Sequence, residues 1–392
     1  MDKKIKLAYY LSHPIQYFSP LLRSLAEKTD LNVYYFSDSS IKGTMDAGFG
    51  QKIKWDVPLL QGYKSRFIRN FSFGRSMNNR FLDAVNPGVI GMIFKDKAGV
   101  IIVNGWSYFS TLLAIVTGKI AGKQIWLRAE NPLNQESRKS RKIIFLKKLL
   151  LEKLLFRIFV DRFLYIGTES KKFFQFYGVP EKKLLYTPYA VDNAFFQGEF
   201  LKYKDDLPAL KTGLHLPIEK KVLLFTGKYI AKKRPMDLLK VFIEINSPDW
   251  QLIMVGEGEL RTEMEAFIRE NNAGNVLLTG FVNQSVIPRY YAVADIFVMC
   301  SGVGETWGLA VNEAMNFAKP IVVSATCGCS VDLVREGVNG FVFGEGDLPA
   351  LKAALLKAMK SEDDRRRMGE ASAVIVSEFS IASIVGNMSK AL

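Results

Sequence analysis

The chain has 392 residues, of which 48% are hydrophobic and 23% charged, and its formal net charge is +14. This composition excludes a disordered or fibrous chain, and the length indicates two domains of about 100 to 200 residues each. The positive charge favours an acidic partner, which is a nucleic acid, an anionic membrane surface or a phosphate-bearing substrate.

The first residues and the cysteines bear on location. The opening MDKKIKLAYYLSHP lacks the apolar core and the cleavage site of a secretory signal. No run of about 18 uninterrupted apolar residues follows, so we expect no membrane span. The three cysteines, Cys300, Cys327 and Cys329, are too few for a disulfide framework, and Cys-Gly-Cys has no second ligand pair for a metal. We therefore predict a cytoplasmic protein without a metal site.

Strand-like runs alternate with helical patterns through both halves of the chain. Most runs are continuously apolar and bounded by Gly, Ser or Asn, as in strands buried on both faces of a parallel sheet. This alternation predicts two doubly wound α/β units. The runs are KIKLAYYLS, LNVYYFSDS, GVIIVNG, KQIWLRAE and RFLYIGTES, followed by KVLLFTGKY, QLIMVGEG, NVLLTGFV, DIFVMCSG and KPIVVSAT.

The strand rhythm lapses once, in a segment rich in Pro, Gly and charged residues that precedes KVLLF. We therefore predict an N-terminal domain over residues 1–193, a linker over 194–217 and a C-terminal domain over 218–380. A last helix, residues 381–392, is expected to cross back to the first domain.

A basic amphipathic segment lies in the first half, over residues 138–157. Its sequence, RKSRKIIFLKKLLLEKLLFR, carries eight basic residues and one acid, with apolar positions at helical spacing. One interpretation is an interfacial helix on an anionic membrane, stabilised by about 1 kcal/mol per basic residue near the surface. The alternative is a core helix with a solvated cationic face.

Three loops of the second half follow predicted strands, where doubly wound sheets bind their ligands. In FTGKYIAKKRP, Gly227 permits close approach of a ligand, and the cations Lys228 and Lys233 suit a diphosphate; a solvated basic loop is the alternative. In MVGEGEL, Gly256 serves a ligand or a tight turn equally well. In LLTGFV, the backbone of residues 280–282 (Gly280, Phe281 and Val282) is placed to pair with a nucleobase edge.

A fourth loop holds two carboxylates in the stretch ETWGLAVNEAM. A helix is expected from Gly308 to Phe317, and its first turn offers unpaired N–H groups to a phosphate. Glu305 lies just outside this helix and Glu313 more than one turn inside it. The two carboxylates are therefore too far apart to share a proton and are expected to touch different parts of one elongated ligand.

These loops together resemble the retaining GT4 (group 1) glycosyltransferases. Glu305 and Glu313, with seven residues between them, resemble the paired-glutamate signature of that family. The flanking segments ADIFVMCS and AMNFAKPIVVSATCGCSVDLVREGVNGFVF, the basic loop FTGKYIAKKRP and the segment LLTGFV follow the family's order. The similarity extends from about Lys221 to Asp347 and implies the GT-B fold, two doubly wound Rossmann-like domains facing each other across a cleft.

The resemblance implies a role for each matching residue. Glu305 would contact the hydroxyls of the donor sugar and Glu313 those of the ribose. Lys228 and Lys233 would neutralise the diphosphate leaving group, so that no metal or other cofactor is needed. The remaining donor-binding positions implied are Gly227, Gly256, Gly280, Phe281, Val282, Thr306, Trp307, Gly308 and Leu309, those around the helix start through backbone N–H groups.

The chain departs from the family pattern at two places. Lys228 stands where the family usually has Arg, and Lys lacks the planar bidentate contact of Arg. The glycine-glycine-x-x-glutamate loop reads GCSVD, with Cys329 for the second Gly and Asp332 for Glu. These departures bear on sugar specificity rather than on the fold.

The first half matches the family less closely and supplies the acceptor candidates. Arg128 and Glu130 stand where the family commonly has a catalytic His; they either face the acceptor or departing phosphate, or form a buried structural pair. His13 and Gln16, in SHPIQYFSP, either contact substrate or shape a turn. The segment DAGFGQKIKWDVPLLQGY is interpreted as an acceptor-recognition loop. It contributes Asp46, Trp55 and Tyr63, and VNGWSYFS adds Trp106 as a wall or as plain core.

The sequence thus predicts a retaining glycosyltransferase (hexosyl or glycosyl transfer) of cell-surface polysaccharide biosynthesis. Its donor would be a nucleoside-diphosphate sugar, with UDP favoured over GDP, and its acceptor a glycan or lipid-linked molecule. One alternative is a basic nucleic-acid-binding protein, although the chain lacks the basic motifs interleaved with aromatics that such modules show. Another is a dinucleotide-dependent oxidoreductase, although no strand is followed by a full GxGxxG.

Overall fold

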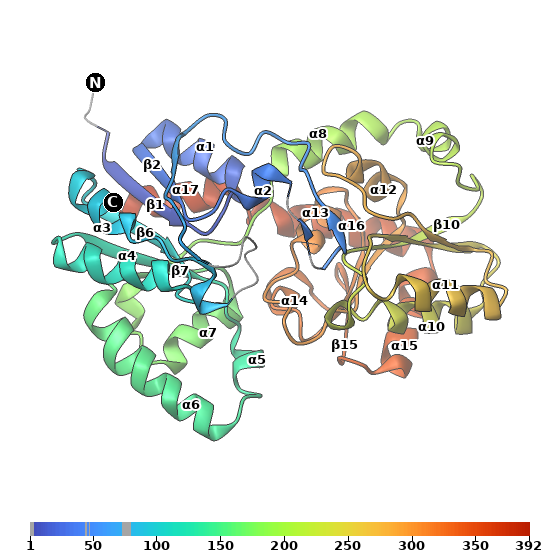
Figure 1. The fold of residues 1–392 in the computed structure, drawn as a ribbon. Coiled ribbons are helices and arrows are strands. Elements are labelled where there is room, and N and C mark those ends of the chain that lie inside the picture. The colour runs from blue at the N-terminus through green and yellow to red at the C-terminus, as the bar shows by residue number, and fades with distance from the viewer. Residues whose placement is uncertain (1–3, 44, 47, 73–79) are drawn as a thin grey trace. The chain divides into compact units, whose positions relative to one another are not determined.

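A computed structural model describes residues 4–43, 45–46, 48–72 and 80–392 of the chain (Figure 1). The chain divides into two compact units. Unit 1 contains Met1–Met45, Lys52–Tyr189 and Ile381–Leu392, and unit 2 contains Asp46–Gln51 and Ala190–Ser380. The segment predicted as a linker, 194–217, instead carries two helices of unit 2, α8 (Asn193–Tyr203) and α9 (Leu207–Gly213).

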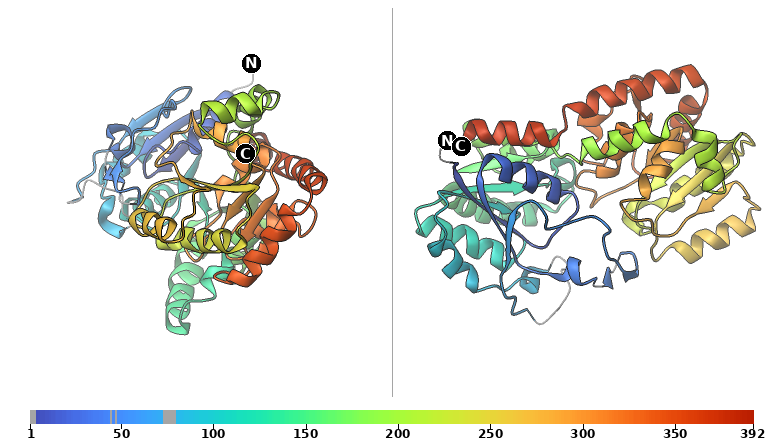
Figure 2. Two further views of the ribbon diagram at one scale, coloured as in Figure 1. Left: turned by 90° about the vertical axis from the view of Figure 1, so that its right-hand side faces the viewer. Right: turned by 90° about the horizontal axis from the view of Figure 1, so that it is seen from above.

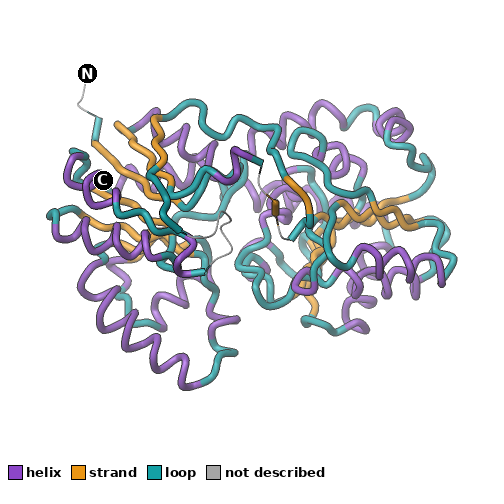
Figure 3. The backbone as a smooth tube through the Cα atoms, in the orientation of Figure 1, coloured by secondary structure: helices purple, strands orange, loops and turns teal. Residues whose placement is uncertain are grey.

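Unit 1 is built on a seven-stranded sheet with the order β5-β2-β1-β6-β7-β8-β9. Every neighbouring pair of strands is parallel, so all carboxyl ends meet at one edge of the sheet. Figure 3 draws the strands in orange. The strands are β1 (Lys6–Leu11), β2 (Asp30–Tyr35), β5 (Lys64–Phe67), β6 (Val100–Asn104), β7 (Gln124–Ala129), β8 (Arg162–Tyr165) and β9 (Leu184–Tyr186). A separate two-stranded sheet joins β3 (Met45–Asp46) to β4 (Gln51–Lys52).

Helices flank this sheet. The final helix α17 packs beside α1, as Figure 2 shows, and α3 packs against α4. Buried aromatic and aliphatic side chains such as Ile101, Phe163 and Phe174 form the core. The helices are α1 (Phe18–Lys28), α2 (Ser39–Lys42), η1 (Phe81–Asp83), α3 (Gly88–Lys95), α4 (Phe109–Ile120), α5 (Leu133–Glu136), α6 (Arg141–Lys147), the π-helix η2 (Lys148–Phe159), α7 (Thr168–Phe176), η3 (Glu181–Lys183) and α17 (Ile381–Ala391).

Unit 2 is built on a six-stranded sheet with the order β12-β11-β10-β13-β14-β15, again with all neighbours parallel. The strands are β10 (Lys221–Thr226), β11 (Trp250–Val255), β12 (Val276–Leu278), β13 (Ile296–Met299), β14 (Ile321–Ser324) and β15 (Gly340–Phe343). Besides α8 and α9, its helices are η4 (Ala231–Lys233), α10 (Pro235–Ile245), α11 (Arg261–Glu270), α12 (Ile287–Val293), α13 (Leu309–Asn316), α14 (Ser330–Leu333), α15 (Leu348–Met359) and α16 (Glu362–Ser377).

The structure confirms the predicted fold class and all ten predicted strands. It adds the two-stranded sheet β3-β4 and extends the two large sheets by β5, β9 and β15, each at the edge of its sheet. Edge strands are short and less apolar because one side is unpaired. In β5, whose sequence is KSRF, three of four residues are exposed. Such a strand carries no continuous apolar run, which is why the sequence pattern does not reveal it.

The last two helices of the chain together contain a long apolar stretch. By length and composition, Glu362–Ala391 is the one helical stretch among the described residues that is able to cross a membrane. In the structure it comprises α16 and α17, whose apolar side chains turn inward: Ile375 and Val376 are buried in unit 2, and Ile384 and Val385 in unit 1. We therefore interpret both as core helices.

Two glycines bring the strand-end loops of unit 2 into backbone contact. The N–H of Gly256 donates to the carbonyl of Gly280 at 3.0 Å, and the N–H of Gly227 donates to Val255 at 2.9 Å. A Cβ atom on Gly256 would lie 1.8 Å from the carbonyl oxygen of Gly227, which no packing adjustment of a side chain relieves. The close approach of two loops therefore requires glycine at position 256.

We expect Gly256→Ala to lower the free energy of unfolding by about 1 to 3 kcal/mol, the usual cost of overpacking. Gly274→Ala is the matched control, because a Cβ there meets nothing within 4 Å. Chemical denaturation of both variants measures the difference. Equal midpoints for the two variants would contradict the packing argument.

Candidate functional site

The carboxyl edge of the unit 2 sheet brings one cation and one carboxylate together. Lys233, in η4, follows β10, and Glu305 lies in the loop that follows β13. Lys233 Nζ donates to Glu305 Oε2, and both side chains are mostly buried, at 18% and 12% exposure. Because β10 and β13 are neighbours in the sheet, the doubly wound topology itself produces this pair.

The loop that carries Glu305 is held from two directions. The N–H of Gly302 donates to the carbonyl of Lys232 at 2.8 Å, which joins the loop after β13 to the one after β10. Glu345 accepts from the N–H of Val303 at 3.2 Å and from the hydroxyl of Thr326 at 2.9 Å. Glu345 is a positioning residue that the sequence analysis missed, since it lies outside any motif.

Burial and a neighbouring carboxylate both affect the pKa of Lys232 in this loop. Burial lowers the pKa of Lys232, and the nearby Glu305 acts in the opposite direction. Lys232 Nζ also lies 3.5 Å from the carbonyl of Gly304. The loop thus places two ammonium groups near one carboxylate, with Lys233 paired to Glu305 and Lys232 beside Gly304, which leaves positive charge for an anionic ligand.

Glu313 lies in the second turn of α13 and is almost fully buried, at 2% exposure. The hydroxyl of Tyr291 donates to Glu313 Oε2 at 2.6 Å, and the hydroxyls of Tyr291 and Thr226 lie 2.9 Å apart. This chain of hydrogen bonds links β10, α12 and α13. It fixes the carboxylate of Glu313 in one position beside the carboxyl end of the sheet.

The first turn of α13 is shaped by Gly308, which precedes the helix with a φ of 107°. A Cβ atom there would also lie 2.8 Å from Met299 Sδ. The indole of Trp307 is 2% exposed, and its Nε1 donates to Asn312 at 2.8 Å. The Trp307 side chain therefore belongs to the core and leaves only its backbone to a ligand, while Leu309 is partly exposed and Thr306 lies in the adjoining turn.

The predicted nucleobase loop meets an unexpected segment. Phe281 packs edge-on against Phe49, with ring centroids 5.0 Å apart, and Lys228 Nζ lies 4.6 Å from the centre of the Phe49 ring. Gly280 and Val282 flank Phe281 and are partly exposed. The segment Asp46–Gln51 belongs to unit 2 and not to the domain predicted to contain it.

The placement of Phe49 adds a contact that the sequence analysis does not predict. The first part of DAGFGQKIKWDVPLLQGY lies beside two predicted donor residues, while its role as an acceptor loop stays a prediction. A single Phe between glycines gives no periodic signal, so the sequence offers no way to detect this contact. Asp46 lies in β3, and its side chain is outside the described part of the chain.

Unit 1 has its own cluster at the carboxyl ends of β6 and β7. Arg128 is 2% exposed and lies between the rings of Phe18, at 4.8 Å, and Tyr189, at 4.7 Å. Its Nη1 lies 3.5 Å from Glu130, which is an ion pair longer than a hydrogen bond. Arg128 Nε and Nη1 make no hydrogen bond within the described part of the chain. Burial raises the pKa of Tyr189 well above its usual value, and Glu130 adds to this effect.

The other acceptor candidates of unit 1 differ in their contacts and in their exposure. His13 follows β1, and its Nδ1 lies 3.0 Å from the Ser12 hydroxyl, while Gln16 is partly exposed in the next turn. Trp106 stacks on Phe173 at 5.9 Å, which favours the plain-core alternative for that residue. Trp55 is partly exposed.

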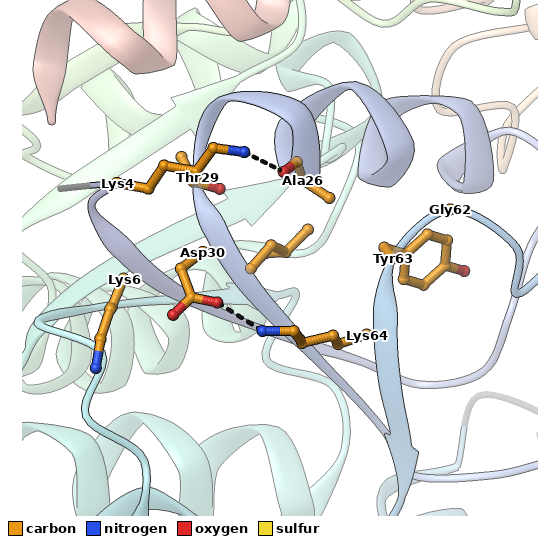
Figure 4. A pocket seen from close by; sticks show the side chains of 9 residues that line it. Lys4, Lys6, Ala26, Thr29, Asp30, Gly62, Tyr63 and Lys64 are labelled. Carbon is orange, nitrogen blue, oxygen red and sulfur yellow. Dashed lines mark hydrogen bonds and ion pairs between the residues drawn. The ribbon is translucent and has the colours of Figure 1, made fainter. Parts of the chain in front are cut away.

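Tyr63 comes just before β5, at the amino ends of the unit 1 strands, whereas Arg128 lies at the carboxyl end of β7. The hydroxyl of Tyr63 is 2.8 Å from that of Tyr35. Figure 4 shows Tyr63 lining a pocket of about 670 Å³ at the amino ends of the strands, together with Lys4, Lys6 and Lys64. Ligands of doubly wound sheets bind at the carboxyl ends, so the structure does not bring Tyr63 to the other acceptor candidates.

Metal ligands do not gather in the part of the chain that the structure describes: no group of three His, Cys, Asp or Glu side chains is placed to hold an ion. Cys300, Cys327 and Cys329 are free and buried. Burial raises the pKa of Cys327 and Cys329 well above the usual thiol value, so these thiols stay protonated. Cys329 lies just before the short helix α14, and Asp332 lies within it.

Known proteins resemble this chain most clearly in unit 2. Residues 209–374 match the family model described as glycosyl transferases group 1. The glycosyltransferase AmsK of Erwinia amylovora, named for amylovoran biosynthesis, is 33% identical over 121 residues, 29% of this chain and 30% of that protein. Alpha-monoglucosyldiacylglycerol synthase of Acholeplasma laidlawii is 27% identical over 146 residues, 36% of each protein.

Solved structures resemble the whole chain. The Anabaena protein HepE, crystallised with UDP and glucose, superposes with a TM-score of 0.75 at 17% identity and covers 99% of both chains. The matches to the curated relatives span less than half of the length of those proteins. The whole-chain likeness shows the GT-B fold, and the part of the chain over residues 209–374 is similar to the group 1 glycosyl transferases.

Proposed function

We propose that this chain is a retaining glycosyltransferase that moves a sugar from a nucleoside-diphosphate sugar, with UDP favoured, to a glycan or lipid-linked acceptor. The observation that carries the proposal is the Lys233–Glu305 pair at the carboxyl edge of unit 2, beside the first turn of α13. A cation and a carboxylate held side by side suit a ligand that has a diphosphate next to a sugar.

The donor residues divide the ligand among them. Lys228 and Lys233 bind the diphosphate and stabilise the negative charge that grows on it as the glycosidic bond breaks. Glu305 accepts hydrogen bonds from hydroxyls of the sugar, and Glu313 accepts them from the ribose. The N–H groups at the start of α13 face the phosphate nearest the sugar. With the charge neutralised by lysines, the proposal requires no metal ion.

The acceptor is assigned to the carboxyl edge of unit 1. Arg128 offers N–H groups that make no hydrogen bond within the described residues, and its guanidinium is held between two rings. Glu130 beside it supplies an acceptor for a hydroxyl proton. His13 and Gln16 follow β1, whose carboxyl end lies at the same edge of the unit 1 sheet. These groups orient an acceptor hydroxyl or stabilise the departing phosphate.

The relatives support the choice of substrates. The structure of HepE holds UDP and glucose, AmsK is named for a polysaccharide and the Acholeplasma laidlawii synthase for a glycolipid. We accordingly place the chain in cell-surface polysaccharide or glycolipid synthesis, at the cytoplasmic face of a membrane. The binding of nucleic acid and the transfer of hydride remain the competing functions.

A thermal-shift panel tests the donor. We expect UDP or a UDP-sugar to raise the unfolding temperature, because a ligand that binds only the folded state stabilises it by about 2.7 kcal/mol at a hundredfold excess over its Kd. GDP, ADP, NAD and a short oligonucleotide complete the panel. A shift with NAD or the oligonucleotide alone would overturn the proposal in favour of a competing function, and a shift with GDP alone would change the base.

The contact of Phe49 with Lys228 gives a second prediction. We expect Phe49→Ala to raise the KM for the donor by about two- to thirtyfold with little change in kcat, since a cation–π contact is worth about 0.5 to 2 kcal/mol. Phe71→Ala is the matched control, because Phe71 makes the same type of contact with Arg69, at 4.8 Å, in unit 1. Steady-state kinetics with varied donor measure both. An unchanged donor KM in Phe49→Ala would remove Phe49 from the site.

A further inference from the structure

A helical segment at the edge of unit 1 exposes a row of large apolar side chains. Helix α6 runs directly into the π-helix η2, and together they lie at the periphery of unit 1 (Figure 1). Seven large apolar side chains in this segment, which we call the apolar row, are 49 to 73% exposed. They are Ile143, Phe145, Leu146, Leu149, Leu150, Leu154 and Ile158.

The opposite face of the same segment supplies the core contacts. Leu151, Leu155 and Phe156 are buried, and the Phe156 ring packs against Phe163 at 5.0 Å and Trp106 at 5.5 Å. Hydrogen bonds in a π-helix close from residue i to i+5, so side chains four or five residues apart share a face. The apolar row follows this spacing, and the core of unit 1 therefore does not account for it.

Cations accompany the apolar row. Six basic residues of the segment and of the turn just before it are exposed: Arg138, Lys139, Arg141, Lys142, Lys153 and Arg157. The start of the segment is fixed by buried Glu136, whose carboxylate oxygens pair at 2.7 Å with Lys139 and Lys147. Large exposed apolar patches mark interaction surfaces, and here the patch is combined with strong positive charge.

A basic pocket adjoins the same segment. It has a volume of about 320 Å³ and lies between η2 and residues 177–183. Its lining includes the cations Lys153, Arg157 and Lys183, the carboxylate of Glu152, which pairs with Lys153 at 2.6 Å, and the apolar side chains of Phe156 and Val179. With one carboxylate among three cations, the pocket keeps a net positive charge beside apolar side chains, which suits a phosphate that is attached to an apolar chain.

We propose that the apolar row and this basic pocket bind the surface of an anionic phospholipid bilayer. The apolar row enters the boundary between headgroups and acyl chains, and Lys153, Arg157 and Lys183 bind a lipid phosphate. Nucleic acid would engage the cations but leave the apolar row in water. A second copy of the chain would oppose six exposed cations with six more, which disfavours that occupant. The inference deepens the proposed placement at a membrane by naming the surface that binds the bilayer, and its observations do not depend on sugar transfer.

Vesicle sedimentation of the full chain tests the surface. We expect binding to vesicles of phosphatidylglycerol and phosphatidylcholine that weakens with added salt, and at least tenfold weaker binding to phosphatidylcholine alone. The double variant Phe145→Ser/Leu149→Ser should lose at least tenfold in partition to the anionic vesicles. In Lys153→Gln/Arg157→Gln, the dependence on phosphatidylglycerol content should diminish.

The matched control is Ile120→Ser, because Ile120 is 73% exposed on α4, away from the apolar row. It should bind vesicles as the native chain does, and unchanged thermal unfolding shows that each variant folds. Equal vesicle binding by Phe145→Ser/Leu149→Ser and the native chain would overturn the proposal. A lipid-free dimer that this variant dissociates, seen by sedimentation velocity, would assign the surface to a second copy instead.

The two proposals of this protein fail separately. Vesicle binding without sugar transfer would support the membrane-binding surface and refute the proposed glycosyltransferase function. Thermal stabilisation by UDP-sugar without vesicle binding would support the proposed function and refute the membrane-binding surface.

Discussion

Replacing Glu305 by alanine is expected to reduce sugar transfer by about two to three orders of magnitude, the usual cost of removing one stabilising group from a transition state. Glu305 is the partner of Lys233 and the carboxylate nearest the proposed sugar site. The variant loses the hydrogen-bond acceptor for the sugar and also frees Lys233 to move away from the diphosphate. The measurement is kcat/KM with the donor identified by the thermal-shift panel.

Glu270→Ala is the control for this substitution, since Glu270 is exposed at the end of α11 in the same unit. Both variants should unfold cooperatively. The Lys233→Ala and Lys233→Ala/Glu305→Ala variants complete a double-mutant cycle, in which strongly non-additive losses indicate that the two residues act as one unit. Native turnover by Glu305→Ala would refute the assignment of this site.

Substitution of Glu313 should produce a different kinetic signature. We expect Glu313→Gln to raise the donor KM by about ten- to a hundredfold with kcat changed by less than about threefold, because hydrogen bonds to charged groups are worth about 1.5 to 3 kcal/mol. The amide oxygen of Gln still accepts from Tyr291, so the buried hydrogen-bond chain is kept. Steady-state kinetics with varied donor separate this effect on binding from the effect of Glu305 on turnover.

Tyr291→Phe serves as the comparison for Glu313→Gln. It removes the hydroxyl that donates to Glu313 at 2.6 Å and leaves a buried carboxylate short of one donor. The expected result is a loss of about 1 to 3 kcal/mol of unfolding free energy, with a smaller rise in the donor KM than Glu313→Gln causes. If Glu313→Gln lowered kcat and left KM unchanged, the ribose role would be wrong.

Much of unit 2 is predictable from the sequence because its signals are local. The continuous apolar runs predict a parallel sheet. The stretch from Glu305 to Glu313 is a local motif that spans one turn and one helix. The helix expected from Gly308 to Phe317 is present as Leu309–Asn316, with Gly308 as its cap. Topology then brings the loops together, because β10 and β13 are neighbours.

What the sequence does not reveal depends on contacts between distant segments. Gly256 looks like half of a ligand-binding motif, yet its lack of a side chain is already required by the carbonyl of Gly227. Nothing in the sequence shows that the indole of Trp307 is buried and donates to Asn312. Glu345 and Phe49 act through partners about 20 to 230 residues away along the chain, and no pattern of spacing connects them.

The inclusion of Asp46–Gln51 in unit 2 has a consequence for the design of chimaeras. Acceptor preference in a two-domain transferase invites exchange of the whole N-terminal part between relatives. Here such an exchange would also replace Phe49 and with it the aromatic neighbour of Lys228 and Phe281. A hybrid meant to change only the acceptor would therefore also change the surroundings of the proposed donor residues Lys228 and Phe281, unless the native residues 46–51 were retained in the graft.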